Sequence, residues 1–414
     1  MRTPLLVAAA LAVAACGEQE AIKQLAQCQR ELGGADAHLA AAQAAQAAAE
    51  RKAQALEEEL RGARDELAAA KTHPGPAATA EGEQPSSAPA GAVASPAPPD
   101  KGSKRLKIGV SLPTREERWV KDKLTMLAEA KKRNIDLLVQ LSEDDPAKQQ
   151  AQCEAMIAQG IKVLIIAPND ASAAAAIVDR AQKAGVAVIS YDRLILDSPH
   201  DYYYLSFDGV KVGELQGEWL TKKVSKGNFI ILSGAPTDNN AKLFKQGAMR
   251  YLQPLIDKGE VKPVLDSPVK DWNPPEAKAL CQKALASAKN NVQAVLAPND
   301  GTAGGCIEAL LEKGLAGKVP VTGQDADVAA AVRIVKGEQG MTVFKDTRLL
   351  GRAALEMAET LARGKPYDTG GRTISNNRRQ VRAVLLTPYA VTRENLDERL
   401  IRSGYLTHEA VYRR

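Results

Sequence analysis

The strongest constraint on the fold is one pattern that occurs twice in the chain. Residues 293–306, QAVLAPNDGTAGGC, contain a short apolar run, a polar loop and the start of a helix-forming segment, and residues 163–177, VLIIAPNDASAAAAI, repeat that order. The helix-forming segment before each copy also carries a cysteine, Cys153 or Cys281. A spacing of about 130 residues is too long for a solenoid repeat and fits two similar lobes. The sequence therefore predicts two α/β lobes whose strand ends meet at a cleft.

The second copy continues into another apolar run, VPVTG, and another polar loop, QDAD. This order predicts a strand-helix-strand unit. Open parallel sheets bind ligands in the crevice outside the carboxyl ends of their strands. The positions where a ligand would be held are therefore Asn299, Asp300, Gln324 and Asp325.

The same alternation extends over most of the chain from residue 104 onward. Four strand-like runs alternate with three helix-forming segments between residues 105 and 193, and a second alternating set begins at residue 227. The chain should return through a hinge near residues 340–347, and its last strand-like stretch lies within 381–396. The predicted fold class is α/β, with two doubly wound parallel-sheet lobes joined by a hinge.

The first sixteen residues, MRTPLLVAAALAVAAC, have one early arginine, an apolar run and small residues before Cys16. This pattern predicts a secretory signal, and its ending VAAC resembles a bacterial lipobox, in which the cysteine is lipidated and becomes the new N-terminus. The run is too short and too rich in alanine for a stable transmembrane helix. The expected result is a lipoprotein held at a membrane face in the periplasm or at the cell surface. The alternative is a plain signal with an incidental cysteine.

Two segments separate this signal from the alternating region. Residues 17–71 consist mostly of strong helix formers, with leucines at 56, 60 and 67 near heptad spacing, and predict a helical stalk. Alanine at the other inward positions gives a weak coiled-coil seam. Residues 72–103 are rich in Pro, Ala, Gly and Ser, cannot bury a core and predict a flexible linker.

Several segments, taken in order, resemble one protein family. They are IGVSLPTREERWVKD, ISYDR, YYYLSFDGVKVGELQG, SGAPTDNNAKLF, APNDGTAGGCIEAL, VTGQDAD, MTVFKD and AVLLTPYAVTRENL. They are similar to the bacterial D-xylose-binding proteins of sugar ABC transporters, in the type I periplasmic binding protein superfamily. The resemblance covers residues 104–414 and implies an N-lobe of about 104–212 and 347–375 and a C-lobe of about 213–346 and 376–414. It also implies a monosaccharide ligand and an ABC permease as partner, with no cofactor.

The resemblance implies a set of sugar-binding residues at the ends of strands from both lobes. Planar polar groups can bond the ring of hydroxyls on a pyranose, and flat aromatic rings can cover its C–H faces. The two tryptophans would stack on the sugar. The implied residues are Arg118, Trp119, Asp192, Arg193, Asp238, Asn240, Trp272, Asn299, Asp325 and Lys345.

Some of these residue types have ordinary structural roles. Asp and Asn in strand-end loops often cap the next helix, and we expect capping for Asp170 and Asp300, because the first residue of each polar pair is better placed for a ligand. Trp219 lies at helical spacing with leucines and is expected in the core. The alternative for Lys345 is a solvated charge.

Other functional classes find little support. The chain has no Gly-rich phosphate loop, its four histidines are scattered, and no Cys/His spacing suits a metal, so we expect neither an enzyme nor a metal site. The formal charge of +5 is small for 414 residues and no basic stripe with interleaved aromatics is present, so nucleic acid is not an expected partner. Lac-repressor-type regulators share the lobes but carry an N-terminal helix-turn-helix where this chain has a signal. A receptor that reports sugar to a sensor kinase or chemoreceptor remains open.

The cysteines other than Cys16 are at positions 28, 153, 281 and 306. Export allows disulfides to persist. Cys281 and Cys306 lie on successive helices of one lobe, but helices on a parallel sheet pack about 10 Å apart, and a disulfide needs a much shorter Cα separation. We therefore expect free, buried thiols in the lobes.

Overall fold

The computed structural model describes residues 105–413. The predicted signal peptide, Cys16, stalk and linker, with Cys28, lie outside these described residues. Within 105–413, no helix is both long enough and apolar enough to span a bilayer.

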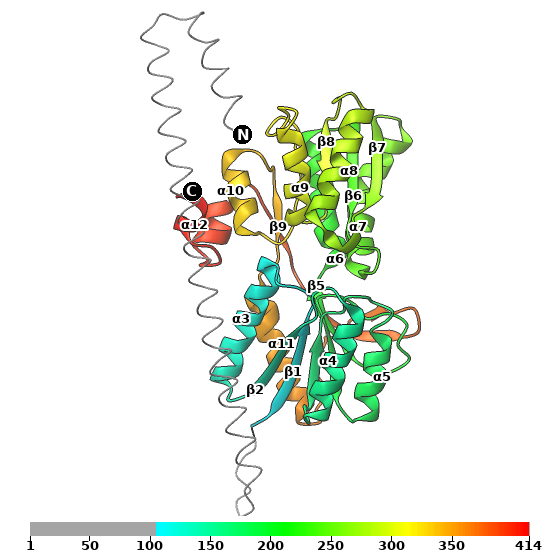
Figure 1. Cartoon of the computed structure of the whole chain (residues 1–414), viewed down its shortest axis with the longest axis vertical. Coiled ribbons are helices and arrows are strands. Elements are labelled where there is room, and N and C mark those ends of the chain that lie inside the picture. The colour runs from blue at the N-terminus through cyan, green and yellow to red at the C-terminus, as the bar shows by residue number, and fades with distance from the viewer. Residues whose placement is uncertain (1–104, 414) are drawn as a thin grey trace, which may run out of the picture. The chain divides into compact units, whose positions relative to one another are not determined.

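The first lobe, here called the N-lobe, is built on a seven-stranded sheet with the order β10-β11-β5-β4-β3-β1-β2. Figure 1 labels β1, β2 and β5 of this sheet. All neighbouring strands are parallel except β10, which pairs antiparallel with β11. The strands are β1 (Lys107–Leu112), β2 (Asp136–Leu141), β3 (Val163–Ile166), β4 (Ala187–Tyr191), β5 (Tyr203–Phe207), β10 (Thr373–Ser375) and β11 (Gln380–Leu386).

Helices cover both faces of this sheet, which explains its continuous apolar runs. Val163 and Ile165 of β3 pack into one core with α3 and α11, and Leu164 and Ile166 pack into a second core with α4 and α5. All four side chains are fully buried because successive residues of a strand point to opposite faces. The helices are α3 (Glu117–Lys132), α4 (Pro146–Ala158), α5 (Ala175–Lys183) and α11 (Thr347–Ala362).

The second lobe, the C-lobe, repeats this plan on a smaller scale. Its strands β7, β6 and β8 are parallel in that order, and single bridges extend the pairing from Val295 to Val321 and from Gln324 to Val343. Strand β9 then pairs antiparallel with β12. The elements are α6 (Gly209–Lys223), β6 (Gly227–Ser233), α7 (Asn239–Asp257), β7 (Val261–Pro268), the 3-10 turn η1 (Lys270–Trp272), α8 (Pro274–Ser287), β8 (Ala294–Leu296), α9 (Asp300–Leu311), α10 (Val328–Lys336), β9 (Thr342–Phe344), β12 (Tyr389–Val391), the π-helical turn η2 (Asp397–Ile401) and α12 (His408–Tyr412).

Helices α6 and α7 lie against each other at an unusually short distance. A Cβ atom on Gly213 would lie 1.8 Å from the carbonyl oxygen of Phe244, and one on Gly247 would lie 2.0 Å from that of Val210. Only glycine permits this approach. The contact fixes α7, whose first residues lie at the ligand cleft. Trp219 of α6 is half-buried against two apolar clusters, as expected for a core residue.

The chain passes between the lobes three times, and the last crossing differs from the predicted boundary. The prediction gave residues 376–414 to the C-lobe, but β11 pairs with β5 from Arg382 opposite Tyr203 to Leu386 opposite Phe207. The run QVRAVLL has the apolar character of an inner strand, and this pairing keeps it in the N-lobe sheet. The chain therefore returns to the C-lobe after Leu386, not before it.

The prediction of free thiols in both lobes is wrong for the C-lobe. Cys281 of α8 and Cys306 of α9 form a disulfide, with a Cα–Cα distance of 5.4 Å. The average spacing of helix axes is a poor guide here because Gly305 lets α9 approach α8 closely: a Cβ on Gly305 would lie 2.1 Å from the carbonyl oxygen of Pro274. Cys153 is a free, buried thiol, as predicted.

Candidate functional site

A polar cavity lies between the lobes, at the ends of their strands. The lining includes all ten residues that the sequence predicted, brought together from segments more than 200 residues apart in the chain. It also includes Gln324, which the strand-end pattern had indicated, and two residues that were not predicted, Glu116 and Phe244. The lining residues are Glu116, Arg118, Trp119, Asp192, Arg193, Asp238, Asn240, Phe244, Trp272, Asn299, Gln324, Asp325 and Lys345.

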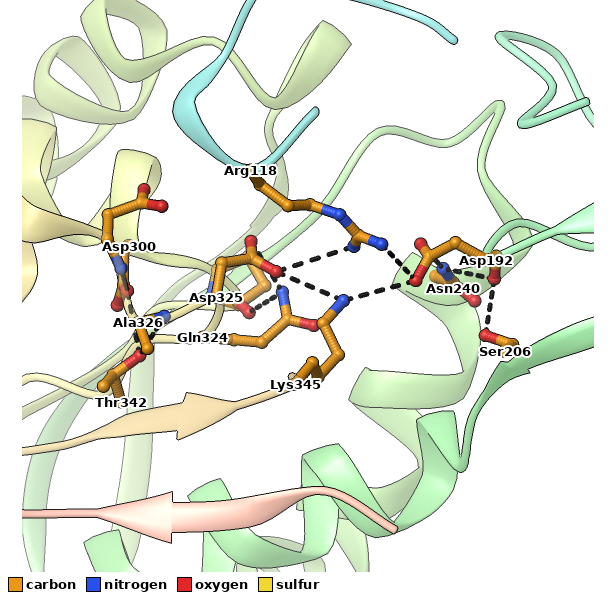
Figure 2. Close-up of polar contacts among 12 residues, drawn as sticks. Arg118, Asp192, Ser206, Asn240, Asp300, Gln324, Asp325, Ala326, Thr342 and Lys345 are labelled. Carbon is orange, nitrogen blue, oxygen red and sulfur yellow. Dashed lines mark hydrogen bonds and ion pairs between the residues drawn. The ribbon is translucent and has the colours of Figure 1, made fainter. Parts of the chain in front are cut away.

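Arg118 reaches across the cleft from the first turn of α3 (Figure 2). Its Nη2 lies 2.6 Å from Oδ2 of Asp192 in the same lobe, and its Nη1 lies 3.6 Å from Oδ1 of Asp325 in the other lobe. Its Nε donates to Oδ2 of Asp122 at 3.2 Å, and Asp122 also accepts a hydrogen bond from the hydroxyl of Tyr191. The guanidinium is therefore fixed on three sides by carboxylates.

Lys345 completes a ring of four buried charges. Its Nζ lies 3.2 Å from Oδ1 of Asp325 and 3.6 Å from Oδ2 of Asp192. Its side chain is only 3% exposed, so the alternative of a solvated lysine is wrong. Arg118 and Lys345 balance the two aspartates, and each cation contacts a carboxylate on either side of the cleft (Figure 2). Buried charges are tolerated only when paired in this way.

The charge ring controls the ionisation of Asp192. Burial by itself would raise the pKa of this carboxyl, but the charges of Arg118 and Lys345 outweigh it and hold the pKa at about 2. The carboxylate also accepts from Nδ2 of Asn240 at 3.2 Å, and the same nitrogen donates to the main-chain oxygen of Asp192 at 3.1 Å. Asp192 is therefore an anion throughout the physiological range.

A second ion pair bridges the lobes beside the ring. Nε of Arg193 lies 2.8 Å from Oδ2 of Asp238, and both side chains are buried. Asp238 is also the N-cap of α7, where its side chain accepts from the main-chain nitrogen of Asn240 at 2.9 Å. Burial raises the pKa of Asp238 although Arg193 opposes this. These contacts join the fourth strand of the N-lobe to the first helix turn of α7.

The aromatic side chains of the cavity have different surroundings. Trp119 is packed in the N-lobe core, and the guanidinium of Arg118 lies 4.2 Å from its ring centroid. Trp272 packs against Phe244 in an edge-on arrangement, with ring centroids 6.2 Å apart. Trp272 therefore forms the apolar wall on the C-lobe side, whereas a cation lies over the ring of Trp119.

Two buried polar atoms of the lining have neither a hydrogen-bond partner nor an ion pair among residues 105–413. They are the indole Nε1 of Trp272 and the amide oxygen Oε1 of Gln324. Buried polar groups are nearly always bonded, so each unpaired atom calls for an explanation. One donor and one acceptor in the wall of a polar cavity are suited to a ligand that carries hydroxyl groups.

Several residues in the loops that line the cavity have positive φ angles, a backbone conformation that is rare for residues other than glycine. Asp192 has φ of 59°, Trp272 has φ of 56°, and the adjacent residues Asp325 and Ala326 have φ of 102° and 56°. Such conformations cost of order 1–3 kcal/mol each and concentrate at functional sites. The strain therefore coincides with the loops that hold the polar groups.

The capping role predicted for Asp300 is wrong. Asn299, predicted as a ligand-binding residue, lines the cavity and is also the N-cap of α9, in a capping box with Thr302. Asp300, expected to cap, is instead buried and accepts from Gln339 and from the hydroxyl of Thr342. The main-chain geometry places the cap one residue earlier than expected.

Asp170 caps the turn that precedes α5 and not the helix itself, so its predicted helix-capping role is only partly met. Its Oδ1 accepts from the main-chain nitrogens of Ser172 and Ala173, at 2.9 Å and 2.8 Å. These donors belong to the turn before α5, whose own N-cap residue, Ala174, has no side-chain cap hydrogen bond. Asp170 does not line the cavity between the lobes.

The sequence carries a signal for two of the remaining lining residues, Gln324 and Phe244. Gln324 stands directly before Asp325 in the same strand-end loop, and the strand-end argument already pointed to it. Phe244 lies one helical turn after Asn240 on α7 and so shares its face. Glu116 carries no motif signal beyond its place in the first loop. No group of three or more His, Cys, Asp or Glu side chains within the described range could hold a metal ion.

Two similar lobes with a polar cavity at their strand ends define the class of two-lobed solute-binding proteins. A model of the periplasmic binding protein domain matches residues 108–366. The D-xylose-binding periplasmic protein of Haemophilus influenzae is 42% identical over 311 residues, covering 75% of this chain and 93% of that protein. The corresponding protein of Escherichia coli is 40% identical over 306 residues, covering 73% of this chain and 92% of its own length.

Solved structures give the same result. A carbohydrate transporter solute-binding protein from Chloroflexus aurantiacus, in complex with D-glucose, superposes with a TM-score of 0.70 at 35% identity and covers 74% of this chain and 98% of its own. The chain belongs to the type I periplasmic binding proteins.

The charge ring predicts how stability depends on pH. Because the pKa of Asp192 is depressed in the folded state, its ionisation stabilises the fold above the unfolded pKa of 3.8, and this contribution is lost as pH falls toward 2. We expect wild type to exceed Asp192→Asn in free energy of unfolding at pH 7, and the difference to shrink by about 1 kcal/mol at pH 3. Denaturant titrations of both proteins at the two pH values measure it. A difference that does not change with pH would contradict the pairing.

Proposed function

We propose that this protein captures a monosaccharide, D-xylose, between its lobes and delivers it to an ABC permease. The observation that carries the proposal is the buried charge ring, which joins both lobes at a cavity whose described lining includes unpaired polar atoms. The relatives named for D-xylose binding match most of the two-lobed region and support the choice of sugar.

The geometry suits a small polyhydroxylated ligand. Carboxylates, an amide, a guanidinium and an ammonium can each bond hydroxyls that both donate and accept. Trp272 offers an apolar face of the kind that packs on sugar C–H groups. The two cations and the two carboxylates of the charge ring balance one another, and a neutral sugar adds no net charge to this buried site.

Binding in this cavity would couple to lobe closure. A sugar that touches Arg118 and Asp192 on one side and Asp325 on the other has contacts in the closed form that the open form cannot offer. That difference in affinity shifts the population toward closure, and the closed form is what a permease would recognise. Binding and release complete this cycle without bond chemistry, so we assign no catalytic role.

A sensing role is the competing proposal. The same closure could report sugar to a sensor kinase or chemoreceptor. Uptake of labelled D-xylose by cells with and without the gene separates the two: loss of uptake supports delivery to a permease, and unchanged uptake supports sensing.

Isothermal titration of the mature protein with D-xylose, D-ribose, D-glucose and D-galactose tests ligand binding. We expect the tightest binding for D-xylose and a roughly 10- to 100-fold weaker affinity in Asp325→Asn, because a charge-assisted hydrogen bond is lost. Asp170→Asn is the matched control, since Asn keeps the cap and Asp170 lies outside this cavity. Absence of sugar binding by wild type, or equal affinity in Asp325→Asn, would contradict the proposal.

We also propose that Cys16 carries a lipid anchor and that residues 17–103 act as stalk and tether. The support is the signal with its VAAC ending. In cells fed labelled palmitate, the wild-type protein should take up label and fractionate with membranes, whereas Cys16→Ser should do neither. Absence of label from the wild-type protein would favour a plain signal with an incidental cysteine.

A further inference from the structure

Helix α10 begins without a cap of its own. Asp327 occupies the N-cap position but makes no side-chain hydrogen bond to the first turn. The main-chain nitrogen of Val328 instead donates to both carboxylate oxygens of Glu117, at 3.1 Å each. Glu117 belongs to α3 of the N-lobe, 211 residues earlier. The cap of this C-lobe helix therefore comes from across the cleft, where Figure 1 shows α3 below α10.

The capped helix directly follows the strained loop of the binding site. That loop carries Gln324 and Asp325, and both Asp325 and Ala326 have positive φ. Two consecutive residues of α3 thus act on it: Arg118 pairs with Asp325, and Glu117 holds its far end at Val328. Movement of the lobes apart would break both contacts together.

The charges around Glu117 complement a carboxylate at this position. Nζ of Lys121 lies 2.7 Å from its Oε1, one turn along α3. Asp327, the N-cap residue of α10, has a pKa raised well above its usual value by burial and by the negative charges of Asp300, Asp325 and Glu117. The helix N-terminus adds a positive dipole end.

We propose that Glu117 is a positioning residue for the sugar: it holds the Gln324–Asp325 loop in its binding conformation by capping α10 from the opposite lobe. The role rests on the proposed function, because it acts only through lobe closure over a ligand. Glu117 does not line the sugar cavity. It therefore sets the lifetime of the closed complex and not the selection among sugars.

A matched control for Glu117 is available in α6 of the C-lobe. Glu218 pairs with Lys222 one helical turn later, at 2.6 Å, as Glu117 pairs with Lys121. Both glutamate side chains are 34% exposed. Glu218 does not line the cavity. Replacing Glu218 by alanine therefore removes the same kind of ion pair within a helix without touching a contact across the cleft.

The test compares the mature wild-type protein with Glu117→Ala, Glu117→Gln and the control Glu218→Ala. Stopped-flow measurement with D-xylose should show a dissociation rate raised about 5- to 10-fold in Glu117→Ala, the size of one lost helix cap, with a smaller change in Glu117→Gln, which keeps an acceptor oxygen. The dissociation rate of Glu218→Ala should match that of wild type.

Two further readouts separate positioning from a general structural role. The melting temperature without sugar should be the same in Glu117→Ala and Glu218→Ala, and the order of affinity among the four sugars should not change. The proposal would be overturned if the D-xylose dissociation rate of Glu117→Ala equalled that of wild type. It would also be overturned if the weaker affinity of Glu117→Ala came with a lower melting temperature in the absence of sugar.

Failure of the proposed function can be told apart from failure of this inference. If wild type bound no D-xylose, the proposed function would be rejected. The contact between Glu117 and Val328 could then be tested only in the protein without sugar. Hydrogen exchange at Val328 in the ligand-free protein would then decide the role of Glu117. Faster exchange in Glu117→Ala than in Glu218→Ala supports the cap across the cleft, and equal exchange overturns it.

Discussion

The site depends on one interaction, the pairing of Arg118 and Lys345 with Asp192 and Asp325 across the cleft. None of the four charges is stable alone in so buried a position, and removing one partner of a buried pair costs about 3–5 kcal/mol. The four charges are paired only when the two lobes are close enough for Arg118 to reach Asp325 and for Lys345 to reach Asp192. Opening of the lobes would therefore separate the charge pairs, and loss of a charge would weaken closure.

The rest of the fold places these four groups. Parallel strands bring Asp192 and Asp325 to the same edge of their sheets, and the glycine contacts between α6 and α7 fix the helix turn that carries Asp238 and Asn240. The cap that Glu117 supplies to α10 extends the same coupling to the rim of the cleft.

Much of this could be predicted from the sequence, because strand-end positions are determined by the alternation of apolar runs and polar loops. The ten candidate residues share the cavity for that reason. What the sequence did not provide depends on main-chain geometry: which residue of the Asn299–Asp300 pair caps α9, how closely Gly305 allows Cys281 and Cys306 to approach, and where β11 leaves the N-lobe sheet. The contact of Glu117 with Val328 joins residues 211 apart and carries no local signal.

The most direct test of the account is a crystal structure of the mature protein with D-xylose. We predict closed lobes, with the sugar ring beside Trp272 and its hydroxyls bonded to Asp192 and Asp325 from opposite lobes. Gln324 Oε1 and Trp272 Nε1 should be among the groups that bond or face the sugar. A sugar bound outside this cavity, or bound to one lobe with the charge ring untouched, would contradict the central claim.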